Sequence, residues 1–183
     1  RFVASLEQLR QLQPILHYQT DIESGGQEAQ LQAQSQLRAI ELTLKALVAR
    51  VWPDQHPLNS FLKQHFGGER LRRWLKLGEG RDALDGMMFS ELALMVVDKK
   101  LFVRHFTQIF NDTSVLMLFV EPRLTLRMFL DDCRLARNAV IAQQPLTSVQ
   151  LMLLNYQYQQ ITHSVQRAFE ERRTRINPAS YLE

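Results

Sequence analysis

The sequence predicts an all-α protein, and two observations carry this prediction. Apolar residues recur at intervals of three and four along almost the whole chain, as they do on one face of a helix. No segment shows the sustained alternation of apolar and polar residues, bounded by turn residues, that is typical of a β-strand. Glycines, prolines and cap-type residues interrupt the helical period, so we expect a bundle of helices joined by turns.

The N-terminal elements are predicted from apolar spacing and from the residues that interrupt it. A first amphipathic helix begins at Phe2 and ends at Ser24–Gly26, and a second runs from about Glu28 until Trp52–Pro53. Two short helices, 58–66 and 69–76, follow on either side of a glycine pair. Segment 77–86 contains three glycines and alternating charge, which favours a mobile loop.

In the C-terminal half the helical period resumes at Leu92 and continues to Phe110, after which Asn111–Ser114 supply cap-type residues. Pro122 suits the first turn of the next helix, which we expect over 122–142. After the break at Pro145, Thr147 or Ser148 caps a last long helix that runs to about Ile176.

Length and composition indicate one domain with a buried core. The 183 residues are 45% hydrophobic and 22% charged, which is ordinary for a soluble globular domain. No internal repeat divides the chain. Within a single domain over 1–183 we expect N-terminal helices (1–76), a loop (77–86), a helical core (87–176) and a tail (177–183).

Charge and cysteine content narrow the classes of function. A net charge of +3 permits contact with nucleic acid without demanding it. Cys133 is the only cysteine, which excludes an intramolecular disulfide and a Cys-rich zinc site and favours a reducing compartment. No apolar run approaches 18 residues and no leader precedes the first helix, so we expect a soluble, cytoplasmic protein without a membrane partner.

The helix over 122–142 carries the candidate functional residues. On a helical wheel Arg123, Arg127, Arg134 and Arg137 fall within a stripe about 80° wide. Apolar side chains occupy most of the remaining circumference, which predicts a central helix. Aligned guanidinium groups require opposing charge, supplied either by acidic side chains such as Asp131 and those of neighbouring helices or by phosphate. Helix statistics alone favour the acidic side chains.

A family resemblance bears on that choice. The run L-A-R-N-A-V-I-A-Q-Q-P-L-T over 135–147, preceded by the apolar helix from Phe89 and followed by a long Gln-rich helix, resembles HEPN domains of bacterial mobile elements and of Swt1-type proteins. The similarity covers about Phe89 to Arg175. It implies a HEPN-like helical bundle with additional N-terminal helices.

The resemblance implies a ribonuclease chemistry that this sequence only partly retains. HEPN ribonucleases use no metal or cofactor and act as dimers whose R-x(4 to 6)-H helices face each other. Arg137 and Asn138 match the arginine and the polar residue, but the positions of the histidine hold Ala142, Gln143 and Gln144. A glutamine amide has no pKa near neutrality and cannot exchange a proton, so we expect weak cleavage or none.

The sequence therefore predicts a catalytically degenerate HEPN-like protein that binds nucleic acid or a protein partner. The resemblance implies a homodimer formed through 122–142, RNA or DNA contact through the arginine stripe, a possible cognate protein, and a bacterial defence, toxin-antitoxin or mobile-element setting. Two alternatives stay open. One is an active metal-independent endoribonuclease that uses Arg137 and Asn138, and the other is a helical scaffold that binds no nucleic acid.

Other candidate residues have ordinary structural explanations. The five histidines, at positions 17, 56, 65, 105 and 163, form no metal-type spacing. His163 replaces the missing imidazole only if its helix folds back against Arg137. Cys133 lacks a histidine at helical spacing and fits a buried, inert thiol. The basic stretch over 69–81 invites a nucleic-acid interpretation, but a solvated helix with Trp74 packed inward is the more usual case.

Overall fold

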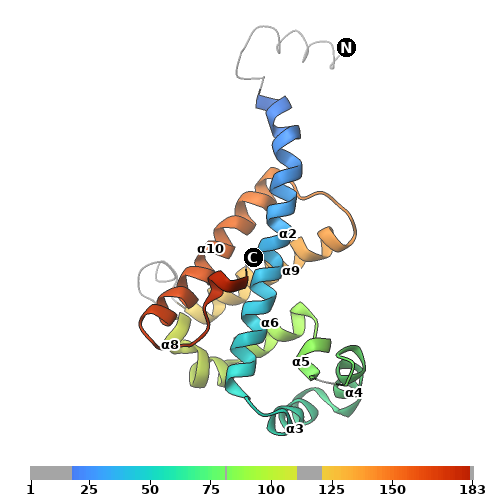
Figure 1. The fold of residues 1–183 in the computed structure, drawn as a ribbon, viewed down its shortest axis with the longest axis vertical. Coiled ribbons are helices and arrows are strands. Elements are labelled where there is room, and N and C mark those ends of the chain that lie inside the picture. Colours follow the sequence, from blue (N-terminus) through green and yellow to red (C-terminus); the bar gives the residue numbers. More distant parts are fainter. Residues whose placement is uncertain (1–17, 81, 111–120, 182–183) are drawn as a thin grey trace.

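The computed structural model describes residues 18–80, 82–110 and 121–181, with side chains from residue 26 on, and this part of the chain folds into helices without a strand (Figure 1). The all-α prediction is confirmed. In chain order the elements are α2 (Tyr18–Val51), α3 (Gln55–Phe66), α4 (Gly68–Leu77), α5 (Ala83–Gly86), α6 (Phe89–Val97), α7 (Lys99–Leu101), the π-helical turn η2 (Phe102–Phe106), α8 (Thr107–Phe110), α9 (Pro122–Ile141), α10 (Ser148–Glu170) and the 3-10 turn η4 (Pro178–Tyr181).

The long helix α2 forms the centre of the bundle. It contacts α6, α9 and α10 and crosses the middle of the view in Figure 1. Its inner face is an apolar row at helical spacing, in which Leu37, Ile40 and Leu44 are at most 4% exposed. The sequence predicted a set of N-terminal helices over 1–76. The described residues of this set share one core with the C-terminal helices.

The predicted helix break at Ser24–Gly26 is wrong, because α2 continues through these residues. A glycine lowers helix stability by about 1 kcal/mol but ends a helix only where the backbone turns, as at Gly67, whose φ is 90°. The part of the expected first helix that precedes Tyr18 lies outside the described residues.

Segment 77–86 also differs from the predicted loop. Its second half forms α5, where Ala83 and Leu84 are buried. A Cβ atom on Gly86 would lie 1.9 Å from the carbonyl oxygen of Trp74, so glycine here permits close backbone packing. The same residue type signals loops and close contacts alike, which explains the error.

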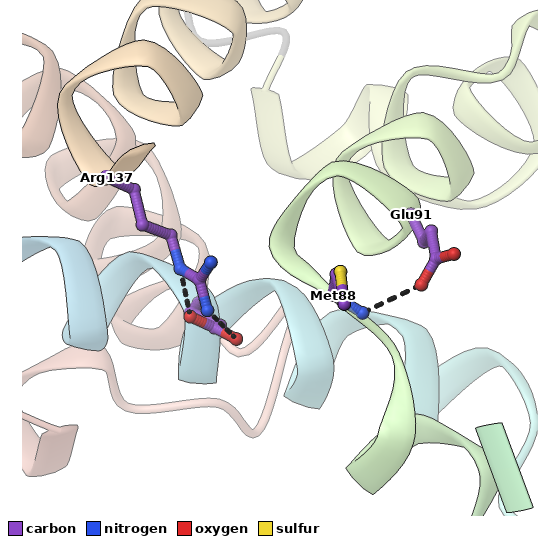
Figure 2. Close-up of polar contacts among 4 residues, drawn as sticks. Met88, Glu91 and Arg137 are labelled. Atoms are coloured by element: carbon purple, nitrogen blue, oxygen red, sulfur yellow. Dashed lines mark hydrogen bonds and ion pairs between the residues drawn. The ribbon is translucent and has the colours of Figure 1, made fainter. Parts of the chain in front are cut away.

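The apolar run from Leu92 to Phe110 folds as consecutive helical pieces. At the start of α6 the amide of Met88 donates to Glu91 Oε2 at 2.8 Å (Figure 2). Asp98 divides α6 from α7 and accepts hydrogen bonds from two backbone amides of the following turn. The cap-type residues predicted at 111–114 lie outside the described residues.

Helices α9 and α10 form an antiparallel hairpin. Pro122 stands in the first turn of α9, and Thr147 caps α10, with its hydroxyl accepting from the amide of Gln150 at 3.3 Å, as predicted. Helix α10 ends at Glu170 rather than near Ile176. The backbone turns there because Arg172 has a φ of 58° and the next amide bonds back to the carbonyl of residue 168.

The predicted central position of α9 is wrong. Leu126, Phe129 and Cys133 face the core, but Met128 and Leu135 are 61% and 57% exposed. Helix α2 occupies the centre instead, so α9 packs through one face only and keeps apolar side chains on its outer side.

Candidate nucleic-acid interface

Three of the four α9 arginines are only weakly neutralised by their partners. Arg123 donates to the carbonyl oxygen of Val97 at 3.2 Å, which orients its guanidinium without neutralising it. Arg127 and Arg134 lie 4.0 Å and 3.6 Å from the carboxylate of Asp131. One exposed aspartate thus serves two arginines, and ion pairs of this kind on a helix surface are weak.

Arg137 is bound differently. Its Nε and one terminal nitrogen lie 3.0 Å and 3.4 Å from the two carboxylate oxygens of Glu41, and both side chains are 28% exposed. Figure 2 shows Arg137 reaching from α9 to this carboxylate on α2. A bidentate pair fixes the guanidinium and joins the two helices. The acidic partner expected on a neighbouring helix is therefore present at Arg137.

Glu41 is a site residue that the sequence analysis missed, although a signal existed. It lies four residues after Leu37 and three before Leu44, within the inner row of α2. A carboxylate on the apolar side of an amphipathic helix needs a partner, because an unpaired charge is costly to bury even in part. Only the packing of α2 against α9 identifies that partner as Arg137.

The other motif positions lie on the surface. Asn138 is exposed on α9, and Ala142, Gln143 and Gln144 are exposed beyond the last helical residue. Gln143 adopts a φ of 57°, and the amides of residues 142–144 bond back to carbonyls of the last turn. The candidate positions for an imidazole therefore belong to the helix cap.

The register of the hairpin separates His163 from Arg137. The side chain of Gln157 on α10 bonds to Asp132 on α9 at 2.7 Å. The helices are antiparallel, so His163, six residues after Gln157, lies about 9 Å from that contact toward the start of α9. Arg137, five residues after Asp132, lies about 7.5 Å from the contact in the opposite direction. His163 lines a hollow with residues of α10 only. The structure does not bring His163 to Arg137.

A groove between α6 and α9, hereafter the α6–α9 groove, is lined by Arg123, Arg127 and Arg134 but not by Arg137. It consists of two adjoining hollows of about 140 Å³ and 380 Å³ that share Leu94, Val97 and Arg127. The smaller hollow adds Ser90, Ala93, Leu130, Asp131 and Arg134, and the larger adds Phe61, His65, Phe66, Met95, Asp98, Lys99, Leu101 and Arg123.

The groove has a positive balance of charge. Three arginines and Lys99 line it, against the carboxylates of Asp98 and Asp131. The Asp98 carboxylate also accepts hydrogen bonds from the backbone amides of Lys100 and Leu101. Cations spaced along an open groove suit a ligand with repeated negative charges, such as a phosphodiester backbone.

Cys133 belongs to the core and not to this groove. Its thiol donates to Gln157 Oε1 at 3.6 Å, and the amide of Gln157 donates to Asp132. Burial, followed by the nearby charge of Asp132, raises the pKa of Cys133 to about 12. The thiol is neutral at physiological pH, which matches the predicted inert thiol.

The basic stretch on α4 provides a second cationic surface. Trp74 is 0% exposed and packs inward, as predicted. Arg72 and Arg73 are exposed on the outer side of this helix. They form no part of the α6–α9 groove and provide a charge-matched comparison for it.

Two classes of site find no support in the described part of the chain. No group of three or more His, Cys, Asp or Glu residues there could hold a metal ion. None of the described helices has both the length and the apolar character needed to span a bilayer.

The described part of the chain is a helical bundle in which the arginine-bearing α9 is joined to α10 by a short connection. The chain belongs to the STY4199-like HEPN family, whose model matches residues 1–178. The family match therefore extends well before Phe89, where the recognisable similarity began. HEPN membership indicates a nucleic-acid-related or ribonuclease-like function in general terms. Searches of curated proteins and of solved structures gave no match.

Proposed function

We propose that this protein binds single-stranded RNA through the α6–α9 groove, as a HEPN domain without effective ribonuclease chemistry. The observation that carries the proposal is the position of Arg123, Arg127 and Arg134 along one open, positively charged groove. Phosphate contacts made by such side chains supply most of the affinity for a nucleic-acid backbone.

Arg137 has a different role in this proposal. Its bidentate pair with Glu41 occupies the guanidinium and fixes α9 against α2. Phosphate binding by Arg137 would require this pair to open, whereas Arg127 and Arg134 already face a shared hollow. We therefore assign the first phosphate contacts to Arg127 and Arg134, and a supporting role to Arg137 and Asn138.

Family likeness supports two further parts of the proposal. HEPN proteins commonly form dimers, and the exposed apolar residues of α9 offer a surface for a second copy. The proposed bacterial defence, toxin-antitoxin or mobile-element setting, with a cognate protein partner, rests on the likeness alone.

Fluorescence anisotropy with a labelled RNA octamer tests the binding step. We expect saturable binding whose affinity falls as salt rises from about 50 to about 200 mM. Each phosphate contact displaces counterions from the RNA, and their release becomes less favourable as the salt concentration rises. Replacing Arg127 and Arg134 with Ala should make the negative slope of log K against log salt shallower, by roughly 0.7 for each phosphate that the variant no longer binds.

The matched control replaces Arg72 and Arg73 with Ala, which removes the same charge from α4. This variant should bind the octamer nearly as the unmodified protein does, because the net charge alone contributes little at about 200 mM salt, where screening is strong. If both double variants lose the same affinity, RNA does not bind specifically in the α6–α9 groove. If the unmodified protein binds no RNA even at low salt, the result supports the alternative of a helical scaffold that binds no nucleic acid.

Cleavage is tested on the same RNA in the presence of a chelator. We expect essentially no products, because loss of a general acid or base costs about 10²- to 10⁴-fold in rate. A Gln143→His variant is the natural gain-of-function test, since histidine tolerates the positive φ at this position. Rapid cleavage by the unmodified protein that vanishes in Arg137→Ala would establish the endoribonuclease alternative.

A further inference from the structure

We propose that the larger hollow of the α6–α9 groove, at its α3 side, binds one nucleoside monophosphate unit. The base stacks on His65, and Arg123 and Arg127 hold the phosphate. This inference rests on the proposed RNA-binding function and deepens it. It adds a ligand class and a recognition residue outside the arginine helix.

His65 ends a stack of three aromatic rings. The ring centroids of Trp52 and Phe61 lie 4.5 Å apart with an interplanar angle of 34°, and those of Phe61 and His65 lie 4.0 Å apart at 25°. Trp52 and Phe61 are half-buried, whereas His65 is exposed. The stack therefore ends in an accessible ring, which a planar base can extend because every base has a π face.

A backbone contact sets the orientation of this imidazole. Nδ1 of His65 lies 3.2 Å from the carbonyl oxygen of Phe61, one turn earlier in α3. A carbonyl only accepts, so Nδ1 carries the proton in this contact and Nε2 remains for a ligand. The ring is thus held in place by a stack on one side and by a hydrogen bond at its edge.

Cations line the same hollow. Arg123 is held by the carbonyl of Val97, Arg127 is 57% exposed with Asp131 4.0 Å away, and Lys99 is exposed at the start of α7. Asp98 is the carboxylate in this hollow. An aromatic platform beside guanidinium groups matches a ligand that is planar at one end and anionic at the other.

Size and continuity agree with a single nucleotide unit. The hollow measures about 380 Å³, which lies within the roughly 300–1,000 Å³ of small-molecule sites. It adjoins the smaller hollow, because Arg127 lines both. A strand whose phosphates follow the groove can therefore place one base on His65.

Calorimetric titration of the whole protein with 5′-AMP, ribose 5-phosphate and inorganic phosphate tests the pocket. We expect AMP to bind at least about 5-fold more tightly than either of the others, since the base adds a stacking contact. His65→Ala should weaken AMP binding about 10-fold, whereas His65→Phe, which keeps a stacking ring, should retain most of it. His163→Ala, which changes another exposed histidine, should leave AMP binding unaltered.

Three results would overturn the pocket. They are equal affinities for AMP and inorganic phosphate, AMP binding that is indifferent to His65→Ala, or tighter binding of O-phosphotyrosine than of AMP, which would indicate a phosphopeptide. Because His65 is exposed, circular dichroism should show that its variants keep their helical content.

Competition with the labelled RNA octamer identifies the source of the nucleotide. If AMP displaces the octamer and His65→Ala weakens both, the pocket takes a unit of the strand. AMP that binds through His65 without displacing the octamer supports a site for free nucleotides. If octamer binding depends on Arg127 and Arg134 but AMP binding does not depend on His65, the nucleotide pocket is excluded and the proposed function is supported. If AMP binds through His65 but the octamer does not bind, the pocket is supported and the proposed function is excluded.

Discussion

At the scale of single residues, the four arginines of α9 differ in what their surroundings allow. Arg137 meets both oxygens of one carboxylate, Glu41, in a partly buried pair, whereas Arg127 and Arg134 share the exposed carboxylate of Asp131. Arg137 is therefore held in a partly buried bidentate pair, whereas Arg127 and Arg134 make weaker ion pairs at the surface. We expect only the pair of Arg137 to contribute measurably to stability.

A double-mutant cycle measures how much the pair of Arg137 and Glu41 contributes to stability. Arg137→Ala and Glu41→Ala should each lower the free energy of unfolding by about 1 kcal/mol, and the double variant should show a coupling of about 0.5–1 kcal/mol. Urea denaturation provides the values. The control Arg134→Ala, which removes a more exposed arginine, should change stability by less than about 0.5 kcal/mol. Strictly additive effects at Arg137 and Glu41 would show that the pair has no energetic weight.

Cys133 gives the protein a specific dependence on alkaline pH. Its pKa is raised from about 9 to about 12 in the folded state, so the unfolded chain loses the thiol proton first. The stabilisation is complete below about pH 9 and is lost as pH rises toward about 12. Between about pH 8 and pH 10.5 the native protein should lose about 1–2 kcal/mol more stability than Cys133→Ala, at about 1.4 kcal/mol per pH unit above about 9. Parallel urea titrations of the two proteins check this, and identical pH profiles would contradict it.

At the scale of elements, short polar and glycine-rich segments shape the packing. The capped turn before α10 holds the hairpin, and α5 packs its backbone directly against α4. Gly86 allows the contact with the carbonyl of Trp74, whereas a Cβ atom added to Gly68, at the start of α4, would meet nothing within 4 Å. Two helical glycines thus have opposite requirements.

Alanine substitution at these two glycines distinguishes their roles. Gly86→Ala should cost at least about 2 kcal/mol of unfolding free energy, because the added methyl group collides with backbone that cannot move independently. Gly68→Ala should be neutral or stabilising by up to about 1 kcal/mol, since it lowers the entropy of the unfolded chain. Thermal and urea denaturation test both. A tolerated Gly86→Ala would mean that α5 is not packed as described.

At the scale of the whole molecule, α9 and α10 both carry exposed apolar side chains, two of which lie close together. Met128 and Leu135 on α9 and Met152 and Leu153 on α10 are 41–69% exposed, and Leu135 and Leu153 line the same shallow hollow. An apolar surface shared by two packed helices is suited to contact with another protein. We expect it to join two copies of this chain, in line with the proposed dimer.

Sedimentation analysis tests that dimer. The unmodified protein should give about twice 21.4 kDa at micromolar concentration, and Leu135→Asp should raise the dimer dissociation constant at least about 10-fold. Val103→Asp, which changes an apolar residue of η2 that is 68% exposed, is the control. A monomer in every case would remove the dimer from the proposed function without affecting the test of RNA binding.

The sequence by itself determined the all-α class, the HEPN family and the ends of several helices. Pro122 in the first turn of α9 and the Thr147 cap of α10 were predictable because proline geometry and capping hydrogen bonds act within a few residues. Apolar periodicity identified the buried rows for the same reason. Where a signal was ambiguous, as at Gly25–Gly26 and in segment 77–86, local rules led to the wrong element.

Only the tertiary structure decided which helix is central and which side chains meet. Glu41 pairs with Arg137 across 96 residues of sequence, and His65 lines the same hollow as Arg127. Both arrangements depend on how α2, α3 and α9 pack together. Local propensity carries no information about such partners, because they are set by the burial of apolar faces contributed by the whole chain. That packing also decides that Arg137 meets a carboxylate of another helix, whereas Arg127 and Arg134 pair with Asp131 of their own helix.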